Sequence, residues 1–379
     1  MHKAIISLFL LAAAACTGGT GGAGDDSAGF DSLIYAPEYA EGFTITGRPG
    51  SQSVMVTATA PWQNADSADV SRILLLRGGE ETPAGFEGAV VDSAARRIVV
   101  MSTTHIAMLD AFGHTDAVVG VSGLDFVSNP EVSGRLDSSA DVGYDGNVNY
   151  ETLAALSPDL VLLYGVSSPS RMEAKLRELR IPYFYVGDYV ENNPLGKAEW
   201  TVALGEITGL RAEAEAAFDS IAASYNRYKG AAAAVTEKPA VMLNIPYGDV
   251  WFMPSVRSYL IRMIDDAGGR YVYGENDTDA SVPVDVEQAY LLADSADVWI
   301  NTGTANSLAE LRQVLPRFAD VRPVRHGRVF NCTRRMTPGG GNDYYESATV
   351  RPDLALRDLI GIFHPDLAAD SLYYYIQLR

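Results

Sequence analysis

Two segments of this chain share one design, and they constrain its architecture more than any other feature. Residues 149–163 and 285–300 each place a glutamate, Glu151 or Glu287, at the start of a short apolar helical pattern that leads through an acidic turn into an apolar strand. Internal similarity of this kind predicts two lobes of similar plan. The helix dipole alone favours a glutamate in a first helical turn, and helix–turn–strand units recur in α/β proteins. The repeat by itself therefore predicts the architecture of the chain and does not identify a function.

Strand and helix patterns alternate around both copies. Short apolar runs predict strands at 98–101, 118–121, 160–164, 183–186, 240–243, 298–300 and 329–330. Helical patterns lie between them at 105–112, 171–179, 258–267, 307–315 and 352–363. This alternation predicts an α/β protein with two Rossmann-like lobes, each built on a central parallel sheet.

The region between the lobes has a helical pattern without strand signals. Apolar residues recur every three or four positions from Ala214 to Tyr228, and a helix of about 20 residues would be ~30 Å long. We expect this helix to join the lobes, although an ordinary surface helix has the same pattern, and we expect Gly209 to interrupt the segment before it. Upstream, residues 30–95 predict short strands and a small N-terminal β-extension.

The start of the chain predicts export. A basic beginning is followed by an apolar run too short for a permanent anchor, which ends in Ala13-Ala14-Ala15-Cys16. Small residues before a cysteine resemble a bacterial lipoprotein box, although Ala13 replaces the commoner leucine, and an ordinary signal peptide is the alternative. Lipidation of Cys16 would hold the protein at the periplasmic face of a bacterial membrane and leave Cys332 without a disulfide partner.

These patterns divide the chain into consecutive parts. We expect a signal peptide at 1–15, a lipidated tether at 16–29, the β-rich extension at 30–95, an N-terminal lobe at 96–193, linker helices at 194–232 and a C-terminal lobe at 233–379.

Charge and motifs exclude several functions. The formal net charge of −19 argues against nucleic acid as a partner. The sequence has no Gly-x-Ser-x-Gly elbow, no phosphate-binding loop and no His-Glu-x-x-His, so we expect no enzymatic activity. The glycine runs at 18–24 and 339–341 do not connect a strand to a helix and indicate flexible backbone. The histidines beyond the signal region are not at ligand spacing, so we expect no resident metal and no other cofactor.

Several segments, taken in order, resemble a known family. A strand beginning at Arg97 leads into a Ser/Thr loop and a helix; Asp141-Val-Gly precedes Glu151 and a Pro-Asp-Leu-Val strand; and the second glutamate segment is followed by Gly327-Arg-Val-Phe330. From about Arg97 to Phe363 the chain is similar to the substrate-binding proteins of ABC importers for ferric siderophores, haem and cobalamin. The resemblance does not cover residues 30–95.

The resemblance implies a fold and partners. It implies two α/β lobes joined by one long helix, with a metal chelate bound between them and any metal arriving inside that chelate. It further implies a monomer that docks through Glu151 and Glu287 to arginines of a permease driven by a cytoplasmic ATPase. A ferric siderophore or cobalamin is the expected ligand, and a haem receptor is the alternative, with His105 or a cleft tyrosine as iron ligand. A cell-envelope α/β enzyme and a surface scavenger of chelates are alternatives of other classes.

Candidate ligand contacts in the N-terminal lobe follow the predicted strands, because open α/β sheets bind ligands at the carboxyl ends of their strands. They are Thr103, Thr104, His105, Tyr144, Tyr164 and Gly165. The threonines would equally well cap the helix that begins there, and a histidine in that turn is compatible with plain packing.

Candidate contacts in the C-terminal lobe are aromatic or polar. They are Tyr247, Trp251, Arg334, Arg335, Asn342, Asp343 and Tyr345. Aromatic walls suit a flat chelate, arginines suit carboxylates or phosphate, and the resemblance implies hydrogen bonds to ligand amides from the last three. Core packing of the aromatics and pairing of the arginines with surface acids are the structural alternatives.

Overall fold

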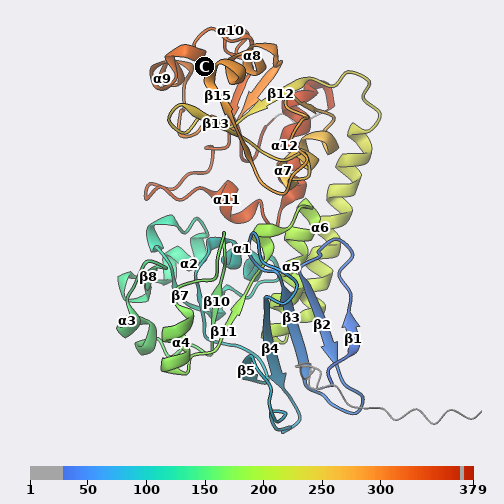
Figure 1. Ribbon diagram of the computed structural model, residues 1–379, viewed down its shortest axis with the longest axis vertical. Coiled ribbons are helices and arrows are strands. Elements are labelled where there is room, and N and C mark those ends of the chain that lie inside the picture. Colours follow the sequence, from blue (N-terminus) through green and yellow to red (C-terminus); the bar gives the residue numbers. More distant parts are fainter. Residues whose placement is uncertain (1–28, 368–370) are drawn as a thin grey trace, which may run out of the picture.

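The computed structural model describes residues 29–367 and 371–379, so the predicted signal peptide and Cys16 lie outside the described residues. Two lobes lie one above the other, and a long helix runs beside both of them (Figure 1). Each lobe has a central sheet of parallel strands, with helices around it. The predicted two-lobed α/β class is therefore confirmed. Within the described residues no helix is long and apolar enough to cross a membrane.

The segment before the first lobe forms a five-stranded sheet of its own, in the order β1-β2-β3-β4-β5. Its strands are β1 (Ser32–Tyr35), β2 (Phe43–Gly47), β3 (Val54–Thr59), β4 (Val70–Leu76) and β5 (Ala89–Asp92). The first four are antiparallel neighbours, and β5 runs parallel to β4. Alternating burial along β2 turns Phe43 and Ile45 inward, as a half-buried strand requires.

Two buried carboxylates hold this sheet against the rest of the molecule. Glu199 accepts hydrogen bonds from Tyr35 Oη and from the backbone N–H groups of Glu38, Tyr39 and Ala40, each at 2.7 Å. Glu191 accepts from Gly42 N at 2.9 Å, and from Glu41 N and the Trp200 indole. The extension is therefore fastened to the first lobe by specific polar contacts made with the loop between β1 and β2.

The N-terminal lobe has a four-stranded parallel sheet in the order β11-β10-β6-β7. Its elements are β6 (Ile98–Val100), α1 (Thr103–Ala111), β7 (Val118–Val121), α2 (Pro130–Arg135), β8 (Gly143–Tyr144), β9 (Asn147–Val148), α3 (Tyr150–Ala155), β10 (Leu160–Leu163), α4 (Glu173–Leu179) and β11 (Tyr183–Tyr185). The apolar runs predicted as strands are fully buried in β6 and β10, as expected for a sheet covered on both faces.

Two helices follow this lobe, separated at Gly209. Helix α5 (Pro194–Thr208) is buried along its whole length, and α6 (Arg211–Ala232) joins the two lobes. Gly209 ends α5 with a φ of 78°, a conformation that glycine adopts without steric cost. The 22 residues of α6 correspond to about 33 Å.

The C-terminal lobe has a five-stranded sheet in the order β14-β12-β16-β17-β18, in which only β18 is antiparallel. Its elements are β12 (Ala240–Leu243), β13 (Val250–Met253), α7 (Tyr259–Asp266), β14 (Arg270–Tyr271), β15 (Val282–Asp285), α8 (Val286–Ser295), β16 (Val298–Ile300), α9 (Leu308–Val314), α10 (Arg322–Arg325), β17 (Val329–Asn331), α11 (Asp343–Ser347), α12 (Pro352–Phe363) and β18 (Ile376–Gln377). An antiparallel pair, β13 and β15, covers one part of this lobe.

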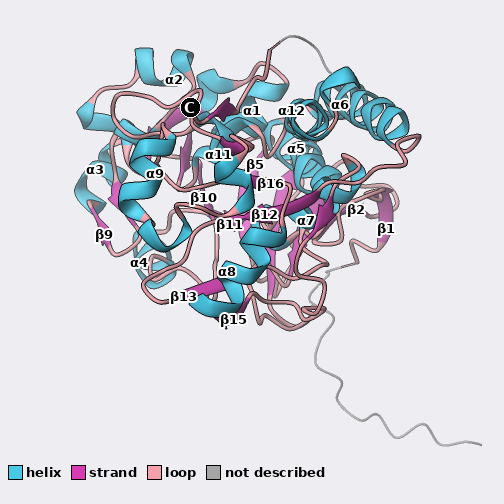
Figure 2. Cartoon of the chain, turned by 90° about the horizontal axis from the view of Figure 1, so that it is seen from above, coloured by secondary structure: helices cyan, strands magenta, loops and turns pink. Residues whose placement is uncertain are grey.

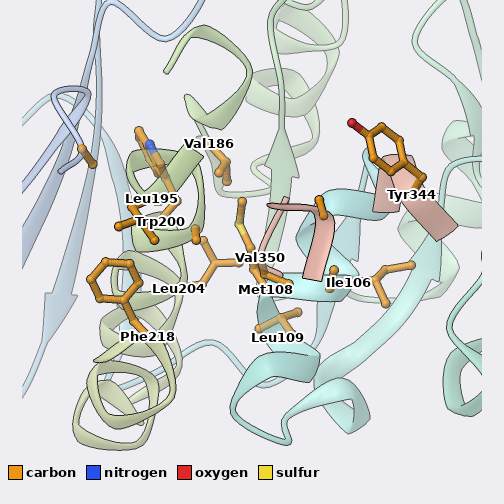
Figure 3. Packing of buried hydrophobic residues seen from close by; sticks show 14 of the residues in the cluster. Ile106, Met108, Leu109, Val186, Leu195, Trp200, Leu204, Phe218, Tyr344 and Val350 are labelled. Carbon is orange, nitrogen blue, oxygen red and sulfur yellow. The ribbon is translucent and has the colours of Figure 1, made fainter. Parts of the chain in front are cut away.

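One hydrophobic core runs through both lobes. It contains residues of α1, α5 and α6 together with Tyr344, Val350 and Leu356 of the C-terminal lobe. Figure 3 shows Met108 and Leu109 of α1 close to Val350. Helices α5, α6 and α12 gather on one side when the molecule is seen from above (Figure 2). The lobes are thus packed together beside α6.

Candidate ligand-binding face between the lobes

The segments that follow the parallel strands bring the two lobes together. Helix α1, which follows β6, packs on α11, which follows β17. The turn η2 (Leu124–Phe126), which follows β7, contacts Gly339, Gly340 and Gly341 of the C-terminal lobe. The carboxyl ends of the two sheets therefore face each other, which is where open α/β sheets bind ligands. We call this region the interlobe face.

The start of α1 is capped within the chain. Ser102 is the N-cap, and its Oγ accepts from Thr104 N at 3.3 Å and lies 2.9 Å from Thr104 Oγ1. Thr103 and Thr104 remain partly exposed at this end of the helix. Capping, the structural alternative for these residues, is what the structure shows for Ser102 and Thr104.

His105 does not reach the interlobe face. Its exposure is 0 %, neither ring nitrogen has a hydrogen-bond partner among the described residues, and burial lowers the pKa of the imidazole to about 3. A ring that is fully buried in the core does not reach the iron of a ligand bound at the interlobe face. The expectation that His105 contacts a ligand is therefore corrected, because α1 turns this face toward the core.

Exposed aromatic side chains do follow the strands. Tyr144, Tyr164 and Tyr345 are exposed, so they are not packed in the core, and Tyr247 is the most exposed of the four at 83 %. Two further exposed aromatics, Phe126 after β7 and Tyr189 after β11, were not singled out from the sequence. Sequence signals existed for both, since each follows a predicted strand by a few residues.

Phe126 and Tyr144 form one aromatic surface on the N-terminal lobe. Their ring centroids are 6.2 Å apart with an interplanar angle of 60°, an edge-to-face arrangement that orients both rings. Tyr144 also lies over Gly123, where an added Cβ would be 2.7 Å from the tyrosine ring. The chain between β7 and β9 therefore presents two large rings held by each other.

Tyr164 stands at a pocket of its own. A cavity of about 320 Å³ is lined by Tyr164, Asp145, the loop 166–171 and the buried ends of β6 and β10. Asp145 accepts a hydrogen bond from Ser170, which closes one wall of the cavity. The neighbouring Gly165 packs on the extension, because a Cβ there would lie 2.8 Å from Cβ of Trp62. Gly165 is thus explained by this close approach and needs no ligand.

Trp251 lies in the core of the C-terminal lobe and does not line the interlobe face. Its exposure is 0 %, its ring centroid is 5.8 Å from that of Trp299 and 5.2 Å from that of Phe318, and its indole N–H donates to Leu243 O at 3.2 Å. Side chains alternate along β13, so Phe252 points outward while Trp251 points inward. The expectation for Trp251 is therefore corrected.

The polar residues after β17 are largely used within the chain. Arg335 forms an ion pair with Asp343 and lies 4.4 Å from the ring centroid of Tyr373. Asn342 is the N-cap of α11 and accepts from Tyr344 N at 3.0 Å. Arg334 is exposed and has no ion pair within the described residues. Of the two expected arginines, Arg334 is the one whose charge is available to a ligand.

A buried charge pair that the sequence did not reveal lies below the interlobe face. Lys197 of α5 has its Nζ 3.8 Å from Asp188 Oδ2 and 4.9 Å from the ring centroid of Tyr259. Burial lowers the pKa of the Lys197 amine and raises the pKa of the Asp188 carboxyl. Lys197 and Tyr259 also line a cavity of about 30 Å³ together with Tyr345. The ion pair joins the start of α5 to the end of the N-terminal lobe, and the contact of Lys197 with Tyr259 joins it to the C-terminal lobe.

Glu151 and Glu287 occupy matching positions on the outside of the lobes. Each is exposed in the first turn of its helix, and neither has an ion pair within the described residues. Asn149 and Asp285 cap the two helices, accepting from Thr152 N at 3.1 Å and Gln288 N at 2.7 Å. Helices α3 and α8 lie away from α6 in both lobes (Figure 1). The two carboxylates are therefore free to meet a partner.

The described residues hold no group of three or more His, Cys, Asp or Glu side chains that could bind a metal ion.

Residues 98–336 match the family described as periplasmic binding protein. The chain belongs to this family. Among relatives of this periplasmic binding protein, an uncharacterized lipoprotein of Methanocaldococcus jannaschii is 25% identical, with 73% of this chain and 67% of the relative covered. A cobalamin-binding protein of Halobacterium salinarum is 26% identical over 66% of this chain and 65% of the relative.

Solved structures give the same fold. The structure of a periplasmic heme-binding protein from Pseudomonas aeruginosa is similar with a TM-score of 0.58 at 20% identity, and 75% of this chain and 98% of that chain are covered. At this level of identity the likeness describes the fold alone. This periplasmic binding protein shares that fold, and its five-stranded extension lies before the family match.

Proposed function

We propose that this periplasmic binding protein captures a cobalamin-type metal chelate at its interlobe face and delivers it to an ABC permease. The observation that carries the proposal is the set of exposed aromatic side chains that follow the parallel strands of both lobes. Such rings bury the large flat area of a corrin ring and lose little conformational entropy on binding. The metal would arrive inside the chelate, and the protein would supply no cofactor of its own.

The charge available in the segment after β17 supports a corrinoid. Arg334 is the exposed arginine of the segment after β17 that has no ion pair, whereas Arg335 is held by Asp343. One cation matches the single phosphodiester of a cobalamin, and ring hydroxyls such as that of Tyr345 suit its amide side chains. A cobalamin-binding relative at 26% identity supports the same choice. A ferric siderophore with several carboxylates or catecholates would require more unpaired cations.

Haem is the second candidate, supported by the fold that this chain shares with a heme-binding protein. Its iron would need an axial ligand, and the exposed Tyr144, Tyr164 and Tyr247 are available while His105 is not. Its two propionates would need two cations. Haem is therefore favoured less than a corrinoid.

Docking and anchoring complete the proposal. Glu151 and Glu287 would each meet arginines of the permease, one per lobe, which agrees with their exposure and lack of partners. Cys16 would carry a lipid at the periplasmic face of the membrane, in keeping with the relative that is named a lipoprotein. A cell-envelope enzyme gains no support from the described residues, and a surface scavenger would differ from a periplasmic receptor in protease accessibility on whole cells.

A binding panel tests the ligand. We expect cyanocobalamin at 100 times its dissociation constant to stabilise the protein by about 2.7 kcal/mol in thermal unfolding. Hemin and several ferric siderophores should give smaller shifts, and the protein repurified after incubation with hemin should show no Soret band. A Soret band together with a larger shift for hemin would replace the corrinoid by haem. No shift with any compound would refute chelate capture.

A further inference from the structure

A hairpin at residues 336–342, here called the glycine hairpin, lies at the interlobe face but carries none of the aromatic rings or the arginine on which the proposed function rests. Met336 and Asn342 pair across it, and its turn is closed by Thr337 N donating to Gly341 O at 2.7 Å. It leaves the C-terminal lobe after β17 and lies between the lobes on the side away from α6 (Figure 1). Its glycine run is therefore placed for contact with the other lobe.

The glycine hairpin meets the first lobe backbone to backbone. A Cβ at Gly339 would lie 2.4 Å from Asp125 O, and a Cβ at Gly341 would lie 2.3 Å from Phe126 O. Thr337 Oγ1 donates to Asp125 O at 3.4 Å. Side chains at these positions would force the two lobes apart, so the glycines are explained by this close approach and not by flexibility.

A second contact follows a few residues later. Ser128 N donates to Glu346 Oε2 at 2.7 Å, and Glu346 is buried in α11, which packs on α1. Both contacts join a C-terminal lobe segment that follows β17 to the loop 123–128 that follows β7. The hairpin contact is made by backbone atoms and the Thr337 hydroxyl, whereas α11 also reaches the continuous apolar core through Tyr344. A polar contact such as that of the hairpin opens at a lower free energy than a packed apolar core does.

We propose that the glycine hairpin is a clasp between the lobes, and that its release from loop 123–128 sets the rate at which ligand enters and leaves the interlobe face. The lobes would then open about the shared core beside α6, with the hairpin side moving most. The part of the proposal that concerns ligand exchange rests on the proposed function, but the clasp itself does not.

A disulfide can trap the clasp without any ligand. A Cβ at residue 339 would lie 3.1 Å from Cβ of Asp125 and 2.4 Å from Asp125 O, so the hairpin must move away from loop 123–128 to hold a cysteine. That movement lengthens the Cβ–Cβ distance toward the range of about 3.5–4.5 Å that a disulfide needs, and the bond then holds the two segments together. We expect Asp125→Cys/Gly339→Cys to cross-link under mild oxidation, as seen by mass spectrometry. Gly134→Cys/Gly339→Cys is the control, because residue 134 has open space around it, and it should not cross-link.

A larger side chain at the contact should separate the glycine hairpin from loop 123–128. In Gly341→Val the side chain would collide with Phe126 O, and we expect hydrogen exchange of the Ser128 amide to accelerate at least tenfold with circular dichroism unchanged. Gly134→Val serves as the control and should leave that amide unaffected. Absence of the cross-link together with an unchanged Ser128 exchange rate would overturn the clasp.

Ligand exchange is then measured with cyanocobalamin by stopped flow. The oxidised cross-linked variant should exchange it at least tenfold more slowly, with recovery on reduction, and Gly341→Val should exchange it faster. Rates within twofold of the parent in both variants would overturn the gating role. If cyanocobalamin does not bind the parent protein, the proposed ligand fails, while cross-linking and amide exchange still decide the clasp.

Discussion

Buried charged residues carry much of the specificity of this fold. Glu199, Glu191, Asp188 and Lys197 are all buried, and each has a polar partner on a different segment of the chain. Burial of a charge is costly unless such partners are present, so removing one partner leaves the other unsatisfied. These residues therefore fix how the extension and the lobes fit together.

Substitution of Glu199 tests whether these buried charged residues hold the extension in place. In Glu199→Ala the four donors that it accepts from, Tyr35 Oη and three backbone N–H groups, lose their acceptor. We expect the free energy of unfolding to fall by about 3 kcal/mol or more in urea titrations. Glu213→Ala on the exposed start of α6 should change it by less than about 0.5 kcal/mol. Equal effects of the two substitutions would contradict the anchoring role.

Glu346 should make stability depend on pH. Burial, opposed by the hydrogen bond from Ser128 and reinforced by the nearby Asp343 and Asp110, raises the pKa of this carboxyl to about 7. A group whose pKa is raised on folding stabilises the folded state at low pH and loses that contribution as pH rises through the raised value. From pH 7 down to about 4.5 the free energy of unfolding should gain up to about 3 kcal/mol from Glu346. Glu346→Gln should flatten this part of the pH profile, and identical profiles would refute the assignment.

The elements were predictable where local patterns decide them. Strands β7 and β12 occupy the predicted residues 118–121 and 240–243, and α12 begins at Pro352 and ends at Phe363 as expected. The burial of Trp251 and His105 was not predicted, because the face that a strand or helix turns inward depends on partners far away in sequence. The pairing of β13 with β15 determines that Trp251 points into the core, and the packing of α1 determines that His105 does.

The break between α5 and α6 can be tested by substitution. Gly209 has a φ of 78°, where an alanine is strained, so Gly209→Ala should lower the free energy of unfolding by about 1–2 kcal/mol. Gly230 lies within α6 with open space around it, so Gly230→Ala should raise stability by about 0.5–1 kcal/mol. Thermal unfolding of both variants shows whether the chain requires the break between α5 and α6 at Gly209. If Gly209→Ala stabilised the protein, the break would not be required.

At the scale of the whole molecule, the repeated glutamates belong to two lobes of similar plan. We expect Glu151→Lys/Glu287→Lys to bind cyanocobalamin with unchanged affinity but to support at least tenfold less uptake with the matching permease, because opposite charges at the dock become like charges. Glu213→Lys/Glu237→Lys changes the net charge equally at exposed positions elsewhere and should transport normally. Normal uptake by the first pair would refute docking through these residues.

The proposed permease contacts require both lobes, because each lobe supplies one of the two glutamates. The sequence placed Glu151 and Glu287 correctly on helix starts, since capping and apolar patterns are local, but it could not place the interlobe contacts of the glycine hairpin. Those contacts join residues 125–128 to residues 337–346, and no local pattern signals such a pairing.

The hydrophobic core that runs from α1 through α5 to the C-terminal lobe has a consequence for how such proteins can be recombined. Exchanging one lobe for that of a relative would cut through Met108, Leu109 and Val350, which pack together across the boundary. A chimaera would therefore need the α1 surface and its partners around Val350 to come from the same parent. The unit that can be transplanted between relatives is the pair of lobes, because neither lobe encloses this core alone.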